Sequence, residues 1–79
     1  MSDSDETKAT TGGSVEEVLP NSLFRVRIPS DKEGEEGELV LAYLAGKMRL
    51  HHIRVLVGDQ VEMVLDPYGG RARIVRRLT

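Results

Sequence analysis

The stretch that decides the fold is "LFRVRIP", residues 23–29. Its apolar side chains alternate strictly with charged ones: Phe24, Val26 and Ile28 fall on one parity, and Arg25 and Arg27 on the other. A period of two is typical of a β-strand with one face in a core and the other in solvent. The proline that follows has no backbone N–H and ends the strand. The sequence therefore predicts a half-buried strand here, with two arginines on its outer face.

Outward from this strand, four more short runs have β character. They are "VEEVL" (15–19), "ELVLAYLA" (38–45), "QVEMVL" (60–65) and "RARIVRRL" (71–78), separated by glycine, proline and asparagine turn signals. Only "KMRLHH" (47–52) is suited to a helical turn, with Met48 toward the core. We therefore predict an all-β fold: a five-stranded antiparallel OB-fold barrel with one short helical turn between strands 3 and 4. The alternative is an SH3-like barrel, which usually lacks that helix.

The 79 residues fit one small domain. Residues 1–13 are polar and without periodicity, so we expect a disordered acidic tail, followed by the folded domain over residues 14–79. There is no cysteine, and therefore no disulfide or thiolate site. The N-terminus resembles neither a secretory signal nor a transit peptide, and the longest apolar run, residues 39–45, is far below the roughly 20 residues of a membrane span. A soluble cytoplasmic protein is the expectation.

The net charge of −2 conceals an uneven distribution. Residues 1–14 sum to −2 and residues 31–38, "DKEGEEGE", sum to −4, so the remainder of the chain carries +4. Most of the acids lie in these two segments, which look flexible, and most of the bases lie in the predicted folded body. This asymmetry favours a polyanionic partner.

Catalytic and metal-binding patterns are weak. His51 and His52 are adjacent, so their rings diverge on a helix or a strand, and no third ligand follows at a usual spacing. No serine stands in a triad-like context, and no glycine-rich phosphate loop opens a helix. We expect no enzyme activity, no metal and no cofactor; the two histidines are either solvated rings or groups that stack on a base or donate to phosphate.

The arginines carry more information. The chain has eight arginines and three lysines, and guanidinium groups bind phosphate and stack on bases better than ammonium groups do. In a small barrel the basic segments can converge on one groove, although scattered surface arginines are the ordinary alternative. Only Tyr43, Tyr68 and a histidine are available as stacking rings, since Phe24 is expected in the core. This is too few for an extended single-strand platform and favours structured RNA.

Five segments together resemble the bacterial translation initiation factor one family. They are "LPNSLFRV" (19–26), "GKMR" (46–49), "IRVLVGDQV" (53–61), "PY" (67–68) and "RIVRR" (73–77), in order and with nearly the expected spacing over residues 14–78. The resemblance implies an S1-like OB-fold that binds the small ribosomal subunit at the aminoacyl-tRNA (decoding) site. There it would contact 16S-type ribosomal RNA and a ribosomal protein, block premature tRNA entry and assist initiation factors two and three. It also implies a non-enzymatic protein that is monomeric off the ribosome and has no membrane role.

By the same resemblance, nine residues are expected to contact ribosomal RNA: Arg25, Lys47, Met48, Arg49, His52, Arg54, Tyr68, Arg73 and Arg77. His52 lies where members often have a stacking tyrosine. The chain departs from the family in its longer, more acidic loop over residues 29–38, in its longer tail, and in "GGRAR" (69–73), which is one residue shorter than usual. The alternatives are a cold-shock-like single-stranded nucleic-acid-binding protein or RNA chaperone, and a protein-interaction adaptor that uses the acidic loop.

Overall fold

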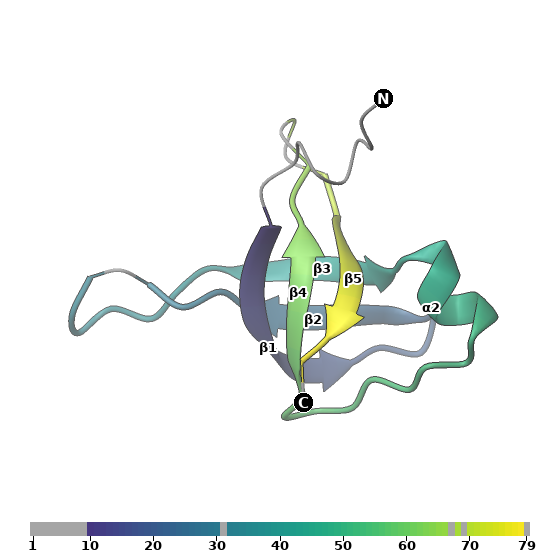
Figure 1. The fold of residues 1–79 in the computed structure, drawn as a ribbon. Coiled ribbons are helices and arrows are strands. Elements are labelled where there is room, and N and C mark those ends of the chain that lie inside the picture. Colours follow the sequence, from purple (N-terminus) through teal and green to yellow (C-terminus); the bar gives the residue numbers. More distant parts are fainter. Residues whose placement is uncertain (1–9, 31, 67, 69, 79) are drawn as a thin grey trace.

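The structure is a computed structural model, and it describes residues 10–30, 32–66, 68 and 70–78. In chain order its elements are β1 (Thr10–Val18), β2 (Leu23–Arg27), β3 (Leu39–Leu44), α2 (Gly46–Leu50), β4 (Gln60–Val64) and β5 (Ala72–Arg77) (Figure 1). Within the described residues, no helix has the length and apolar character needed to cross a membrane.

The five strands close into one barrel in the order β1-β2-β3-β5-β4, and β1 completes the circle by pairing with β4. The predicted all-β five-stranded barrel, with a short helix between the third and fourth strands, is confirmed. The barrel was also predicted to be antiparallel, and one pair of strands differs. β3 and β5 run parallel, with Ala42 opposite Ala72 and Leu44 opposite Ile74. The chain returns from β3 to β5 through α2 and β4, and this crossover lets the two strands run in the same direction.

The first strand begins earlier than the sequence predicted. β1 starts at Thr10, so residues 10–13, which were assigned to the tail, pair with β4, with Gly13 opposite Val61. A Cβ atom on Gly13 would lie 2.6 Å from Cγ1 of Val26 and 2.9 Å from the carbonyl oxygen of Arg27. A glycine therefore allows β1 to approach its neighbours here. The predicted disorder of residues 1–9 lies outside the described residues.

Alternation along the strands builds the core. Its buried members come from every strand, from α2 and from the connection between α2 and β4: Val15, Phe24, Val26, Ala42, Met48, Val55, Val61, Met63, Ala72 and Ile74. Of the three residues predicted to face inward at β2, Phe24 and Val26 are in this set, and Ile28, just after β2, is partly buried and packs against it. β4 ends at Val64, and the next residue, Leu65, is 40% exposed. Met48 belongs to α2, so the helix packs against the barrel through one apolar side chain.

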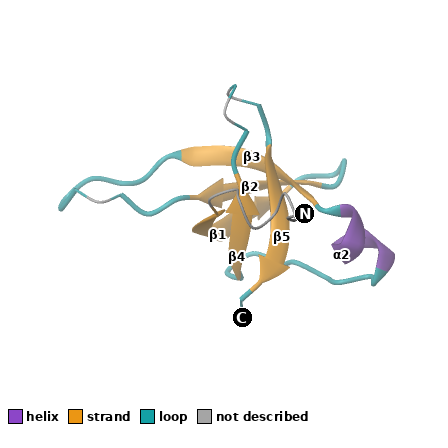
Figure 2. Ribbon diagram, turned by 45° about the horizontal axis from the view of Figure 1, so that its top comes forward, coloured by secondary structure: helices purple, strands orange, loops and turns teal. Residues whose placement is uncertain are grey.

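The connection between β2 and β3, described over residues 28–30 and 32–38, projects away from the barrel, and we call these residues the acidic arm (Figure 1). Its base is closed by a backbone hydrogen bond from Ile28 N to Glu38 O, at 2.8 Å. Gly37 lies so close to the backbone of Ile28 that a Cβ atom there would overlap the Ile28 carbonyl group. Figure 2 shows the arm and α2 on opposite sides of the barrel, one beyond each end of β3.

Candidate nucleic-acid interface

The basic end of the molecule is built by α2. Successive helical residues are separated by about 100°, so burial of Met48 turns Lys47 and Arg49 outward on either side of it. Met48 is 2% exposed, whereas Lys47 and Arg49 are exposed. The helix has no acidic residue in its first turn and carries both cations in its last turn. The sequence thus makes a short helix that is anchored by one side chain and presents two positive charges.

The segment that follows, residues 51–59, is the α2–β4 connection, and it is held at several points. Val55 is buried, and Ile53 N donates to Met48 O at 3.0 Å. Nη1 of Arg77 on β5 donates to the carbonyl oxygen of Arg54 at 2.8 Å. These contacts fix the backbone at Arg54, whose side chain is exposed to solvent.

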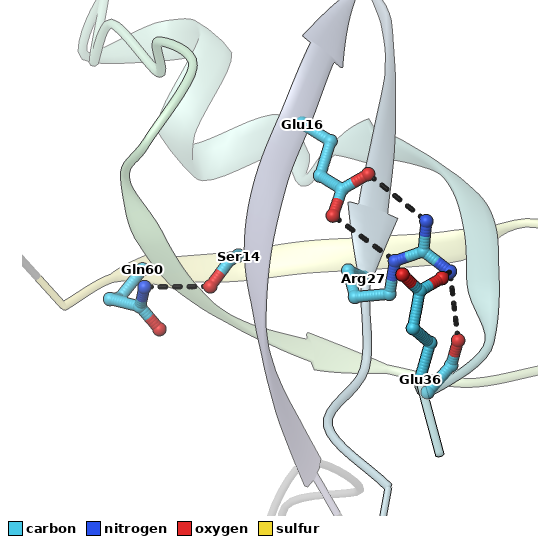
Figure 3. A network of polar contacts seen from close by, with 6 residues as sticks. Ser14, Glu16, Arg27, Glu36 and Gln60 are labelled. Atoms are coloured by element: carbon cyan, nitrogen blue, oxygen red, sulfur yellow. Dashed lines mark hydrogen bonds and ion pairs between the residues drawn. The ribbon is translucent and has the colours of Figure 1, made fainter. Parts of the chain in front are cut away.

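Other arginines are neutralised by acids on neighbouring strands. Nε of Arg25 lies 3.1 Å from Glu17 on β1, and Nε of Arg76 lies 3.4 Å from Glu62 on β4. The guanidinium of Arg27 contacts both Glu16 and Glu36 (Figure 3). Its Nη1 also donates to Gly37 O at 2.9 Å. The hydrogen bond from Arg27 to Glu16, together with the positive charge of Arg27, lowers the pKa of the Glu16 carboxyl below its ordinary value.

The cations at the α2 end are in a different situation. Among the described residues, no acidic side chain forms an ion pair with Lys47, Arg49 or Arg54. Within the described part of the chain, α2 and the α2–β4 connection thus carry three exposed cations that are not paired with an acid. Exposed and uncompensated cations of this kind are suited to phosphate oxygens.

A hollow of about 270 Å³ lies beside these cations. It is lined by Asn21, Ser22, Leu23, Tyr43, Leu44 and Arg49. The ring of Tyr43 is 39% exposed, and Arg49 links the hollow to α2. An aromatic ring, a guanidinium group and an amide next to one another can stack on an unpaired base and hydrogen-bond to its edge.

Asn21, Ser22 and Tyr43 were not among the nine predicted contact residues. Tyr43 had been recognised only as an available ring, and Asn21 only as part of a turn signal. The signal that could have found the hollow is the strand register, which places Tyr43 directly opposite Leu23, next to that turn.

The structure groups only part of the predicted set. Lys47, Arg49, His52 and Arg54 are exposed on α2 and the segment after it, and Arg77 is tied to that segment through its hydrogen bond to Arg54. His52 has a φ of 55°, a left-handed conformation at the end of the helix that is uncommon for a residue other than glycine. Arg73 lies half-buried on β5.

Three predicted residues are in other settings. The burial of Met48 contradicts the prediction that it contacts RNA, because a core side chain that is 2% exposed offers no surface to RNA. Arg25 lies on β2 in an ion pair with Glu17. Tyr68 is 94% exposed between β4 and β5 and is not part of the hollow at Tyr43. Among the described residues, no group of three or more His, Cys, Asp or Glu side chains is arranged to hold a metal ion.

Comparison with known proteins gives a consistent result. The family model for translation initiation factor 1A / IF-1 matches residues 1–79. The solution structure of translation initiation factor one from the Wolbachia endosymbiont strain TRS of Brugia malayi superposes with a TM-score of 0.69 and 30% identity, covering 94% of this chain and 82% of that one. The crystal structure of YjeQ from Thermotoga maritima gives a TM-score of 0.70 and 31% identity over 90% of this chain.

The chain spans only 23% of the YjeQ structure, so that likeness concerns one part of a larger protein. The initiation-factor structure, in contrast, is matched over most of its length. The OB-fold and the resemblance to initiation factor one that the sequence predicted are both confirmed. This protein belongs to the translation initiation factor 1A / IF-1 family.

Proposed function

We propose that this protein binds the small ribosomal subunit at the aminoacyl-tRNA (decoding) site, where it blocks premature tRNA entry during initiation. The observation that carries the proposal is the cluster of Lys47, Arg49 and Arg54, which are exposed and have no ion-pair partner among the described acids. Family membership indicates that the process is translation initiation. The cluster offers a surface that can bind a ribosomal RNA backbone.

The proposed binding mode has two parts. Lys47, Arg49 and Arg54 contact phosphates, and these contacts set the position of the protein without reading sequence. The hollow between Tyr43 and Arg49 takes up a base that is splayed out of its helix, and stacking there gives a preference for a particular RNA shape. Both parts need RNA that is already folded, as ribosomal RNA is.

The remaining elements of the proposal rest on the family. We place the protein in the cytoplasm, where it acts with initiation factors two and three and contacts a ribosomal protein near the decoding site. It acts by occupying the site and not by catalysis, and we expect it to be monomeric when it is off the ribosome.

The test combines a salt titration with a competition footprint on purified small subunits. If about five phosphates are neutralised, the slope of log affinity against log salt concentration is about −4. The nucleotides of the decoding site are expected to become protected from chemical probes, and tRNA that occupies the site is expected to displace the protein from the subunit. Binding that is indifferent to salt, or protection confined to another part of the subunit, would overturn the proposal.

A second candidate is a cold-shock-like single-stranded nucleic-acid-binding protein or RNA chaperone. It is favoured by the exposure of two tyrosine rings, Tyr43 at 39% and Tyr68 at 94%, because exposed rings stack on bases of any sequence. Equal affinity for a generic single-stranded oligonucleotide and for small subunits would favour this candidate. If the protein instead binds the decoding site, we expect its affinity for small subunits to be at least tenfold higher than for the oligonucleotide.

A further inference from the structure

At its beginning, strand β3 has one edge with which no described strand pairs. On one side it pairs with β2 along nearly its whole length, from Leu39 opposite Arg27 to Tyr43 opposite Leu23. On the other side its ladder with β5 includes only residues from Ala42 to Leu44. Residues 39–41 therefore have a neighbouring strand on one side only among the described residues.

Two backbone hydrogen bonds show which groups point toward the open side. Ile28 N donates to Glu38 O, so residue 38 points toward β2, and Ala45 N donates to Ile74 O, so residue 45 points toward β5. Because these directions alternate along a strand, odd-numbered residues of β3 point to the β5 side. The N–H of Leu41 and the N–H and C=O of Leu39 thus face a side on which no described strand pairs with them.

A cleft lies against this edge. Its volume is about 510 Å³, and its lining comes from the start of β3, the end of β4 and the approach to β5: Glu38, Leu39, Val40, Leu41, Leu65, Asp66, Gly70, Arg71 and Ala72. Leu39 and Leu65 are each about 40% exposed. The cleft thus combines an open backbone edge with aliphatic side chains, and it leaves room where β5 would otherwise continue.

Charge indicates what the cleft can accept. It contains two acids, Glu38 and Asp66, and one cation, Arg71. Glu38 is also the last residue of the acidic arm, whose described acids Glu33, Glu35 and Glu36 are exposed. Phosphate would be repelled by this surround, whereas lysine or arginine side chains would be attracted.

We propose that residues 39–41 of β3 accept an extended, basic peptide segment of a partner protein by β-augmentation. Backbone groups of Leu39 and Leu41 would bind the peptide backbone, as in other complexes in which a peptide adds a strand to an open sheet edge. Alternate peptide side chains would lie on Leu39 and Leu65 and against the acids of the cleft and arm. The site lies at the opposite end of β3 from α2, so it is independent of the proposed RNA surface and can be filled at the same time.

The probe is an acetylated and amidated peptide, Lys-Val-Lys-Val-Lys, titrated into ¹⁵N-labelled protein. Its valines favour an extended backbone and its lysines match the acidic surround. The amide signals of Leu39 and Leu41 are expected to shift most, and hydrogen exchange at Leu41 is expected to slow. The matched peptide Glu-Val-Glu-Val-Glu is expected to bind at least tenfold more weakly. Shifts centred on α2, or no shifts at millimolar peptide, would overturn the proposal.

Two substitutions separate backbone pairing from simple charge attraction. Leu41→Pro removes an N–H that faces the cleft and not β2, so the barrel is retained while peptide affinity falls at least tenfold. If this variant does not fold, a synthetic chain with N-methylated Leu41 removes the same donor.

Glu38→Gln lowers the peptide affinity severalfold, whereas Glu17→Gln on β1, the matched control, leaves the peptide affinity unchanged. Unchanged binding to a folded Leu41→Pro or N-methylated chain would overturn the proposal. Loss of ribosome binding in Arg49→Ala leaves this peptide site intact, so the two proposals fail separately.

Discussion

Gly13 is a position inside the barrel at which one added carbon atom has a definite expected cost. In Gly13→Ala the new Cβ would meet Cγ1 of Val26 at 2.6 Å, the Arg27 carbonyl at 2.9 Å and Cε of Met63 at 3.2 Å. Two side chains and a backbone carbonyl in a closed barrel must then move, so we expect a loss of about 1–3 kcal/mol in the free energy of unfolding. Urea denaturation measures it as a lower midpoint with an unchanged slope.

Gly46→Ala is the matched control, because nothing lies within 4 Å of a Cβ at that position. Gly46 is the first residue of α2, and alanine favours a helix by up to about 1 kcal/mol over glycine. This variant is expected to keep or raise the midpoint. Equal losses in both variants would show that the Gly13 contact is not the cause.

Gly13 and Met48 also show what the sequence can and cannot reveal about single residues. The alternation at Phe24 and Val26 predicted burial correctly. The residues before Ser14 have no apolar periodicity, so the sequence did not predict that they form a strand. In the sequence, a glycine that is required where three strands approach closely cannot be distinguished from a glycine in a disordered tail. Met48 was assigned to both the core and the RNA surface, and only the packing of α2 on the barrel decides for the core.

The cations on α2 and the α2–β4 connection give the next prediction. Arg49→Ala and Arg54→Ala are each expected to weaken binding to small subunits about tenfold or more, because a hydrogen bond to a charged group contributes about 1.5–3 kcal/mol. Arg76→Ala is the matched control, since Arg76 is an exposed arginine already paired with Glu62. Filter binding at fixed salt measures all three.

Stability shows whether these arginines act through RNA or through the fold. The unfolding midpoints of Arg49→Ala and Arg54→Ala are expected to stay near that of the parent protein. Ile74→Ala, which empties a fully buried site in β5, is expected to cost about 2–5 kcal/mol. If the arginine variants lost as much as Ile74→Ala, they would have a structural role.

The pairing of β1 with β2 carries a pH-dependent contact. Hydrogen bonds from Arg27 lower the pKa of Glu16 in the folded state, so this contact stabilises the fold above the ordinary glutamate pKa. Its contribution is lost as the pH falls through the lowered value. In Arg27→Gln the NMR titration midpoint of the Glu16 carboxyl is expected to rise toward the ordinary range. An unmoved midpoint would contradict this assignment.

The sequence predicted which strands and which helix would form better than it predicted which strands would pair. Alternation located β2, β4 and β5, and helix-forming residues located α2. The parallel β3–β5 ladder could not be read from either strand, because it depends on how the crossover through α2 and β4 closes the barrel. The partners of Arg25 and Arg27 were missed for a similar reason: Glu16 and Glu17 belong to β1, and only the strand register brings them opposite β2.

For the molecule as a whole, the net charge of −2 conceals an acidic segment and a basic segment that lie at different ends. The acidic arm lies beyond the start of β3, and α2 lies beyond its end (Figure 1). The six residues of β3 alone span roughly 20 Å. Charges this far apart influence each other strongly only where salt is dilute, because the screening length is about 30 Å at 0.01 M and about 8 Å at 0.15 M.

This distance predicts how neutralisation of the acidic arm affects RNA binding. In a variant with Glu33, Glu35, Glu36 and Glu38 all changed to Gln, affinity for an RNA hairpin of the decoding-helix sequence is expected to change less than about twofold at 0.15 M salt. At about 0.01 M it is expected to rise severalfold, mainly through faster association, because repulsion between the arm and phosphate is then unscreened. Stopped-flow fluorescence at the two salt concentrations measures both rates.

The same experiment distinguishes a remote arm from one that contacts RNA. A tenfold or larger change at 0.15 M would mean that the arm lies against the nucleic acid, since screening removes effects acting over the length of β3. Arg49→Ala is the reference, because its loss of affinity is expected to persist at both salt concentrations. A neutralised arm that behaves like the parent at 0.15 M, beside an Arg49 variant that does not, places RNA at the α2 end and leaves the acidic end free for another partner.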